Sequence, residues 1–185
     1  MLTLKDGQKQ ALLRRARQGI VSVFDPGAPI EPLEDRVFSQ KAGLFVTLKM
    51  KGELKGCIGF ITGVEPLKEA VIHLAREAAF HDPRFPPLQR EELDSITIEI
   101  SILSPLTRVA DLSRIRPGYH GLVVRNGARS GLLLPQVAVE HHWNRDEFVR
   151  NTCWKAGLPP EAVFWPETEI FSFTAEIFSD KGSSG

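Results

Sequence analysis

The sequence predicts an α+β fold built of mostly antiparallel sheets with helices packed on them. Two observations support this class. Turn signals at Lys51-Gly52 and Asn126-Gly127 each join consecutive short apolar runs, as in β-hairpins. Residues 96–102 alternate isoleucine with polar residues, which is typical of a half-buried strand. The predicted order contains too few strand-helix-strand crossovers for a doubly wound parallel sheet.

The first half of the chain is predicted to hold two helices around a hairpin. Residues Leu4–Phe24 place apolar side chains at the spacing of one buried helical stripe. A proline-containing loop then leads to a hairpin formed by Gly43–Lys49 and Glu53–Gly59. A second amphipathic helix is expected over Pro66–Phe80, followed by an extended loop that several prolines stiffen.

The second half is predicted to hold a hairpin, a helix and a last strand. Asn144 and Glu147 form the capping-box pattern of a helix start, and Gly157 ends that helix. The other predicted segments are the strands Gly121–Arg125, Ser130–Leu134 and Glu169–Ser179, a strand end at Pro135-Gln136, and a frayed tail from Asp180 that includes residues 181–185.

Composition excludes several classes of protein. With 185 residues and 42% hydrophobic content, the chain is long enough for one domain or one domain of two lobes. Basic and acidic residues balance at 23 each, which argues against a nonspecific nucleic-acid binder or a binder of anionic membranes. The start of the chain lacks an apolar signal region and no run reaches the length of a membrane span, so a cytoplasmic protein is expected.

The most informative stretch is Lys55-Gly56-Cys57-Ile58-Gly59. Period two places Lys55 and Cys57 on one face of the predicted strand, where a positive charge favours the thiolate form of cysteine. Glycine on both sides of Cys57 indicates a bulge or a close approach of another backbone or a ligand. Two interpretations stay open, a small buried hydrophobic residue or a reactive thiol. Cys153, in a helical pattern, is interpreted as packing.

A nucleophilic Cys57 needs a base, and the sequence offers several histidines for that role. His120 lies just before a predicted strand and His81 lies in the stiff loop, and both positions suit a side chain at the rim of a cleft. His141 and His142 are adjacent on a segment expected to be extended, so their side chains point to opposite faces and a shared metal ion is not expected. Sequence does not choose among these histidines.

Three acidic or basic residues are further candidates. Asp82 and Arg84 are two residues apart in a segment expected to be extended, so both point to one side, where they form an ion pair or bind a polar ligand. Glu140 enters a segment expected to be partly buried, and burial raises the pKa of a carboxyl and suits it to acid–base chemistry. Capping of a backbone donor is the alternative for Glu140. His73 lies between glutamates on a helix and is interpreted as a surface residue.

The stretch around Cys57 resembles the signature of the AMMECR domain family, in which the equivalent of Lys55 is commonly arginine. The resemblance covers roughly residues 10 to 178. It implies a single α+β domain over residues 1–180, with a larger and a smaller lobe that meet at a cleft. Further blocks in family order are Gly43–Leu48, Ala79–Phe85, Tyr119–Leu122, Leu134–Ala138, Glu140 with Trp143, and Cys153–Leu158.

Three hypotheses on function follow, and none of them names a cofactor. The leading one is an enzyme with a cleft around Cys57 that acts on an unknown polar small molecule or peptide. The alternative is a noncatalytic binding or carrier module, and the resemblance implies Memo-like and radical-SAM proteins as its partners. A nucleic-acid regulator is the third, which the balanced charge disfavours. The enzyme hypothesis assigns Cys57 as nucleophile, Lys55 as the cation that favours its thiolate, His120 or Glu140 as proton carriers, and Asp82 with Arg84 as ligand-binding residues.

Overall fold

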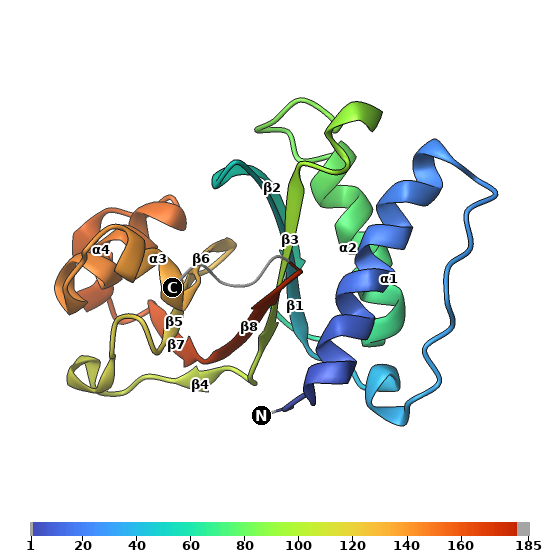
Figure 1. Cartoon of the computed structure of the whole chain (residues 1–185). Helices are drawn as coiled ribbons and strands as arrows, with labels where there is room; N and C mark the ends of the chain where they lie inside the picture. The colour runs from blue at the N-terminus through green and yellow to red at the C-terminus, as the bar shows by residue number, and fades with distance from the viewer. Residues whose placement is uncertain (1, 181–185) are drawn as a thin grey trace. The chain divides into compact units, whose positions relative to one another are not determined.

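The structure, a computed structural model, describes residues 2–180, and the chain divides into two compact units (Figure 1). Unit 1 comprises the residues up to 103 together with those from 176 onwards, and unit 2 comprises Ser104–Ala175. The predicted α+β class is confirmed, since each unit combines helices with a sheet of antiparallel strand pairs. A cleft between lobes stays a prediction, and the predicted tail over 181–185 lies outside the described residues.

Unit 1 is a four-stranded sheet with two helices on one face. The strands lie in the order β2-β1-β3-β8, which makes β2 an edge strand. Helices α1 and α2 lie side by side across one face of this sheet (Figure 1). The elements are α1 (Asp6–Phe24), β1 (Gly43–Met50), β2 (Glu53–Phe60), α2 (Leu67–Phe80), β3 (Ile96–Leu103) and β8 (Ala175–Ser179), with short 3₁₀ helices at Arg36–Ser39 and Arg90–Glu92.

The core of unit 1 follows the predicted period of two. Leu44, Val46 and Leu48 of β1 are fully buried, as are the alternating isoleucines of β3. Each such side chain contributes about 1.5–3 kcal/mol through burial. The intervening residues, among them Thr47 and Glu99, share the other face of the sheet, which α1 and α2 leave uncovered.

The two glycines that flank Cys57 mark close approaches, as expected. A Cβ at position 56 would overlap the carbonyl oxygen of Ala78 in α2, so the helix lies directly against the backbone of β2. A Cβ at position 59 would overlap the ring of Phe45 on the other face. The expected bulge is also present, because the register between β1 and β2 shifts next to Leu48 and leaves Lys55 as the extra residue.

Unit 2 is a second four-stranded sheet, in the order β4-β7-β5-β6, with α3 and α4 packed against β5 and β6. Cys153 is fully buried in its core beside Phe148, which confirms the packing interpretation. No helix within residues 2–180 is long and apolar enough to cross a membrane. The elements are β4 (Thr107–Arg108), β5 (Gly121–Asn126), β6 (Arg129–Leu133), α3 (Pro135–Glu140), α4 (Arg145–Lys155) and β7 (Glu169–Phe173), with 3₁₀ helices at Leu112–Arg114 and Pro160–Phe164.

Two sequence predictions in this half are wrong. The segment that begins at Pro135 is a helix and not a strand end, because proline lacks an N–H and fits the first turn of a helix. The predicted last strand is interrupted at Thr174, and its halves β7 and β8 belong to different sheets. Ser104 fixes the interruption, since its Oγ accepts from the Thr174 N–H at 3.0 Å and its N–H donates to the Thr174 carbonyl at 2.9 Å.

Asp180, which was predicted to begin the frayed tail, is held in place by side-chain contacts. Asp180 is anchored to unit 1 through an ion pair with Arg17. Its carboxylate also accepts a hydrogen bond from the Ile98 N–H at 3.0 Å. Asp180 therefore ties the end of β8 to both α1 and β3.

Candidate functional site

Cys57 lies in the middle of β2, on the sheet face that α1 and α2 leave uncovered. It is opposite Thr47 of β1, and Thr47 is in turn opposite Glu99 of β3. These three residues form a polar row across three strands. The Thr47 hydroxyl donates a hydrogen bond to Cys57 Sγ at 3.3 Å. Cys57 itself is half-buried.

The backbone of Cys57 is held at the free edge of the sheet by Asp82 and Arg84. The Cys57 N–H donates to Asp82 Oδ2 at 2.9 Å, and the Cys57 carbonyl accepts from Arg84 Nη2 at 2.9 Å. We call this pair of residues the Asp82–Arg84 clamp. It supplies an acceptor and a donor where a neighbouring strand would otherwise pair, and so it protects the edge.

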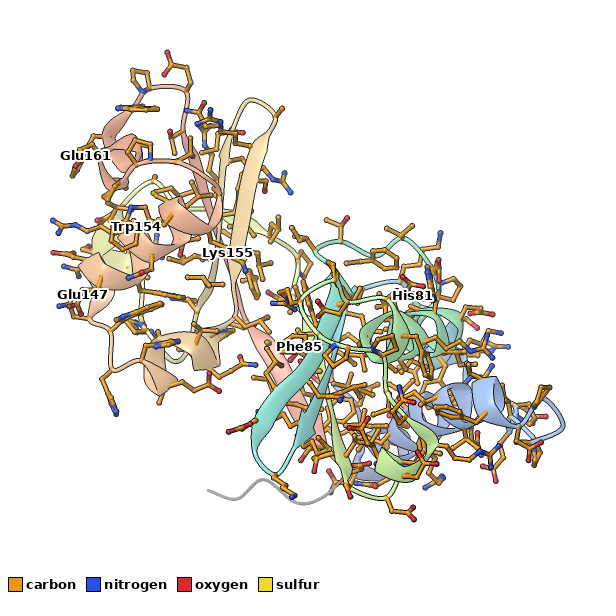
Figure 2. All side chains as sticks on the ribbon, turned by 90° about the horizontal axis from the view of Figure 1, so that it is seen from above. His81, Phe85, Glu147, Trp154, Lys155 and Glu161 are labelled. Carbon is orange, nitrogen blue, oxygen red and sulfur yellow. The ribbon has the colours of Figure 1, made fainter. Side chains whose placement is uncertain are left out.

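The clamp residues are bound to each other as an ion pair, as the sequence suggested. Arg84 donates from Nε to Asp82 Oδ1 at 2.9 Å and from Nη2 to Oδ2 at 2.7 Å. The segment is a turn and not extended, because the Arg84 N–H also donates to Asp82 Oδ1 at 3.1 Å. In Figure 2, His81 and Phe85 mark the loop after α2 that carries the clamp.

Burial and charge differ between the two partners of the clamp. The side chain of Asp82 is 2% exposed and that of Arg84 is 47% exposed. The hydrogen bonds from the Arg84 side chain are the main cause that lowers the pKa of Asp82 to about 2. Asp82 is therefore ionised at neutral pH, and Arg84 presents a fixed guanidinium to solvent.

Burial raises the pKa of the Cys57 thiol above its ordinary value, and the charges of Asp82 and Glu99 raise it further. The hydrogen bond from Thr47 and the charge of Arg84 act in the opposite direction. Lys55, which was predicted to favour the thiolate form of Cys57, does not do so in the structure. Its Nζ lies 2.9 Å from Glu92 Oε1, and the cation beside the thiol is Arg84.

This arrangement predicts slow alkylation of Cys57 at neutral pH. Because burial raises the pKa of the thiol above its ordinary value, we expect Cys57 to react with iodoacetamide more slowly at neutral pH than an unperturbed thiol does, and faster as the pH is raised. Replacement Arg84→Gln removes the nearby cation and moves the midpoint to still higher pH. Peptide mass spectrometry on the folded protein measures both cysteines, with fully buried Cys153 as the protected control. Fast alkylation of Cys57 at pH 7 would contradict the prediction.

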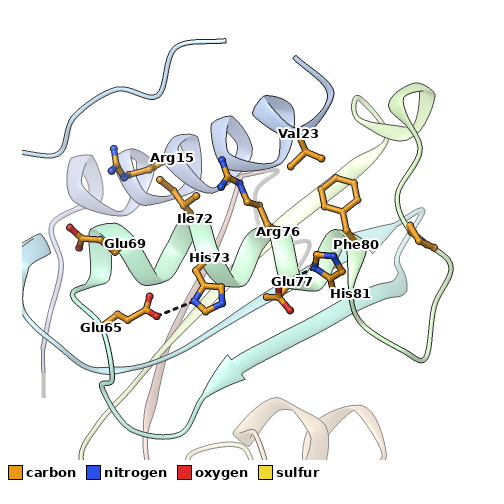
Figure 3. A pocket seen from close by; sticks show the side chains of 11 residues that line it. Arg15, Val23, Glu65, Glu69, Ile72, His73, Arg76, Glu77, Phe80 and His81 are labelled. Atoms are coloured by element: carbon orange, nitrogen blue, oxygen red, sulfur yellow. Dashed lines mark hydrogen bonds and ion pairs between the residues drawn. The ribbon is translucent and has the colours of Figure 1, made fainter. Parts of the chain in front are cut away.

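The two histidines of unit 1 belong to a groove along α1 and α2 (Figure 3). His81 Nδ1 lies 2.9 Å from Glu77 Oε1, and His73 Nδ1 lies 3.1 Å from Glu65 Oε1. Figure 3 shows these pairs at the surface of a groove of about 790 Å³. His73 is thus a surface residue, as predicted, and the Nδ1 of His81 faces Glu77.

The two predicted proton carriers lie in unit 2. His120 follows a tight turn, and its Nδ1 accepts from the Arg116 N–H at 3.0 Å. Burial, aided by the charge of Arg116, lowers the pKa of His120. Glu140 ends α3 and is exposed, so the partial burial on which its acid–base candidacy rested is not found. Unit 1 by itself brings together Cys57, Asp82 and Arg84.

Sequence reasoning missed Thr47 and Glu99, which complete the row with Cys57. The alternation of side chains along a strand could have identified both residues. Thr47 interrupts the apolar residues of β1, and Glu99 lies between the isoleucines of β3. Only 6% of Thr47 is exposed, so its hydroxyl is held inside the site. Its hydrogen bond fixes the orientation of the Cys57 thiol.

The second pair of histidines does not form a metal site among the described residues. The ring of His141 stacks on that of Trp143 at a centroid distance of 4.6 Å. His142 adopts a positive φ of 54°, so the segment turns here and is not extended as expected. Within residues 2–180, no group of three or more metal-ligating side chains is found.

Comparison with known proteins decides the family. The AMMECR1 family model matches residues 13–178. The chain belongs to the AMMECR1 family. A protein of Thermococcus gammatolerans is 44% identical, over 100% of this chain and 96% of its own. A protein of Methanothermobacter thermautotrophicus is 51% identical over 79% of each chain.

A solved structure shares the AMMECR1 fold. The crystal structure of uncharacterized protein PH0010 from Pyrococcus horikoshii aligns with a TM-score of 0.90 and 42% sequence identity. The alignment covers 98% of this chain and 96% of the Pyrococcus chain. AMMECR1 membership therefore establishes the fold, and the activity has to be argued from the residues around Cys57.

Proposed function

We propose that this AMMECR1-family chain is a binding module that holds a carboxylate or carbonyl group of a polar small molecule or peptide beside Cys57. The observation that carries the proposal is the state of Arg84. Its Nε and Nη2 are fixed by buried Asp82, yet 47% of its side chain is exposed. A guanidinium that is already fixed loses little conformational entropy when it donates to a ligand.

The charges around Arg84 are balanced. Asp82 balances the charge of Arg84, and Lys49 balances that of Glu99 at 3.1 Å. Recognition then rests on the geometry of the donors and not on a strong electrostatic field. Half-buried Cys57, whose carbonyl accepts from Arg84, lies next to the proposed contact.

Binding is favoured over nucleophilic catalysis by the chemistry of the thiol. A cysteine nucleophile needs a lowered pKa or an adjacent base. Burial raises the pKa of Cys57, and its thiol accepts a hydrogen bond from the hydroxyl of Thr47 and not from a base. A covalent adduct on Cys57, or a turnover that Cys57→Ser abolishes, would favour the enzyme hypothesis instead.

Nuclear magnetic resonance of the labelled chain tests the binding proposal, with citrate as the carboxylate probe. We expect saturable shifts of the Arg84 Nε–H and of the Cys57 amide, because both donate to Asp82 directly beside the guanidinium that would contact the ligand. Arg84→Gln should abolish these shifts, and Arg84→Lys, which keeps the charge without the planar fork, should weaken binding by roughly tenfold. Arg14→Gln is the matched control, since Arg14 is 59% exposed on α1.

The result that would overturn the proposal is equal binding in the parent chain and in both Arg84 variants, each verified as folded by circular dichroism.

Partnership with Memo-like and radical-SAM proteins is a separate part of the proposal and rests on the family resemblance. A pull-down with the full chain tests it. Failure to recover either protein at micromolar concentration would count against that part alone.

A further inference from the structure

Unit 2 contains a pocket of about 600 Å³. The size falls within the range of sites for small organic ligands. All of the residues that line it lie between Ser104 and Thr174. The walls come from β4, from the end of β7, and from the loop that leads to β5.

A tight turn brings three pocket residues together. Pro117 and positive-φ Gly118 (81°) occupy the centre of the turn, which is the pattern of a type II turn. The N–H groups of Tyr119 and His120 both donate to the Arg116 carbonyl, at 3.1 and 2.9 Å. Arg116, Tyr119 and His120 therefore lie together at one wall of the pocket.

The turn also fixes the tautomer of His120. Its Nδ1 accepts the Arg116 N–H at 3.0 Å, so in the neutral ring the proton resides on Nε2. Burial lowers the pKa of this ring, and the nearby charge of Arg116 adds to the effect. His120 thus supplies a neutral N–H donor at neutral pH.

The charges that line the pocket are unbalanced. Arg108, Arg114 and Arg116 line it together with a single carboxylate, Asp111. That carboxylate is already occupied, because it accepts from the N–H and the hydroxyl of Ser113 at 2.8 and 2.7 Å.

Arg114 and Arg116 are available to a ligand, whereas Arg108 is paired. Arg108 lies 3.6 Å from Glu169 in an exposed ion pair. Arg116 lies over the ring of Tyr119, 4.2 Å from its centroid. Within residues 2–180, the guanidinium groups of Arg114 and Arg116 donate no hydrogen bond to another residue. The pocket therefore holds two guanidinium groups with free donors.

We propose that this pocket binds the phosphate group of a small phosphorylated molecule, with Arg114 and Arg116 as charged donors and His120 as a neutral donor. Guanidinium groups match phosphate oxygens in a bidentate manner. A phosphate presents more acceptor oxygens than a carboxylate and so uses donors from several directions. The site lies wholly in unit 2 and is independent of the function proposed for Arg84.

Titration of the full-length chain with inorganic phosphate, followed by residue-resolved nuclear magnetic resonance, tests this site. We expect saturable shifts at the His120 ring and at the backbone amides of Arg116, Gly118, Tyr119 and His120. Arg114→Gln and Arg116→Gln should each weaken binding by roughly tenfold, the usual effect of removing one charge-assisted contact. Arg150→Gln, an exposed arginine on α4, is the matched control and should leave binding unchanged.

Several outcomes would overturn the proposal. One is the absence of saturable shifts at roughly 10 mM phosphate in buffer of low ionic strength. Another is unchanged affinity in the double variant of Arg114 and Arg116, both of which are exposed and outside the core. Tighter binding of citrate than of phosphate at the same amides would assign the pocket to carboxylates.

Discussion

Replacement of Gly56 by alanine is expected to destabilise the chain by more than about 3 kcal/mol. The added Cβ would overlap the carbonyl oxygen of Ala78, and a backbone atom of a helix cannot move aside as a flexible side chain can. The clash separates α2 from β2, so it disrupts the core of unit 1. Denaturation in urea, followed by circular dichroism, measures the change in the free energy of unfolding.

Gly7→Ala is the matched control for this experiment. Gly7 lies in the first turn of α1 with nothing within 4 Å of an added Cβ. Alanine is the better helix former, so we expect a stabilisation of up to about 1 kcal/mol. Equal urea midpoints for Gly56→Ala and the parent chain would show that α2 does not lie directly on β2.

Replacement Asp82→Asn is expected to lower the free energy of unfolding by about 2 kcal/mol at neutral pH. Asp82 accepts hydrogen bonds from the Cys57 N–H and from Arg84 while its side chain is 2% exposed. Its pKa in the folded chain is about 2, below the ordinary value of 3.8. Urea denaturation at a series of pH values measures the difference between variant and parent.

The sign of the pH dependence follows from this lowered pKa. Ionised Asp82 stabilises the folded chain, so its contribution is fully present above the ordinary pKa and is lost as the pH falls through about 2. The parent and Asp82→Asn should therefore converge in stability at acid pH. Glu53→Gln, which replaces an exposed carboxylate at the start of β2, is the matched control and should leave the free energy of unfolding nearly unchanged. A constant gap between parent and Asp82→Asn down to pH 2 would contradict the argument.

Local patterns predicted most of the fold. The alternating isoleucines identified β3, Asn126-Gly127 identified the turn between β5 and β6, and Asn144 identified the start of α4. Each of these signals depends on residues that are close in sequence. Besides the division of the last strand at Thr174, the exception is α3, whose short apolar run from Pro135 fits a strand as well as a helix. The length of such a segment does not distinguish the two.

The candidate site was predictable only in part, because its decisive contacts are distant in sequence. Cys57, Asp82 and Arg84 could each be selected from sequence, but the hydrogen bond from the Cys57 N–H to Asp82 joins residues 25 apart. The pKa of Cys57 depends on burial by the packed sheet, which no local pattern reveals. Lys55 was assigned to the thiol because strict alternation was assumed, and the bulge at Lys55 breaks that alternation.

The position of β8 sets the order in which the chain can fold during synthesis. This strand is a member of the unit 1 sheet, yet it is translated after the whole of unit 2. On the ribosome, β3 consequently waits with an unpaired edge while residues 104–175 are added, for a time on the order of 10 s. Removal of the chain from residue 175 onwards would delete β8 and leave that edge open permanently, and aggregation of truncated chains through β3 is the expected result.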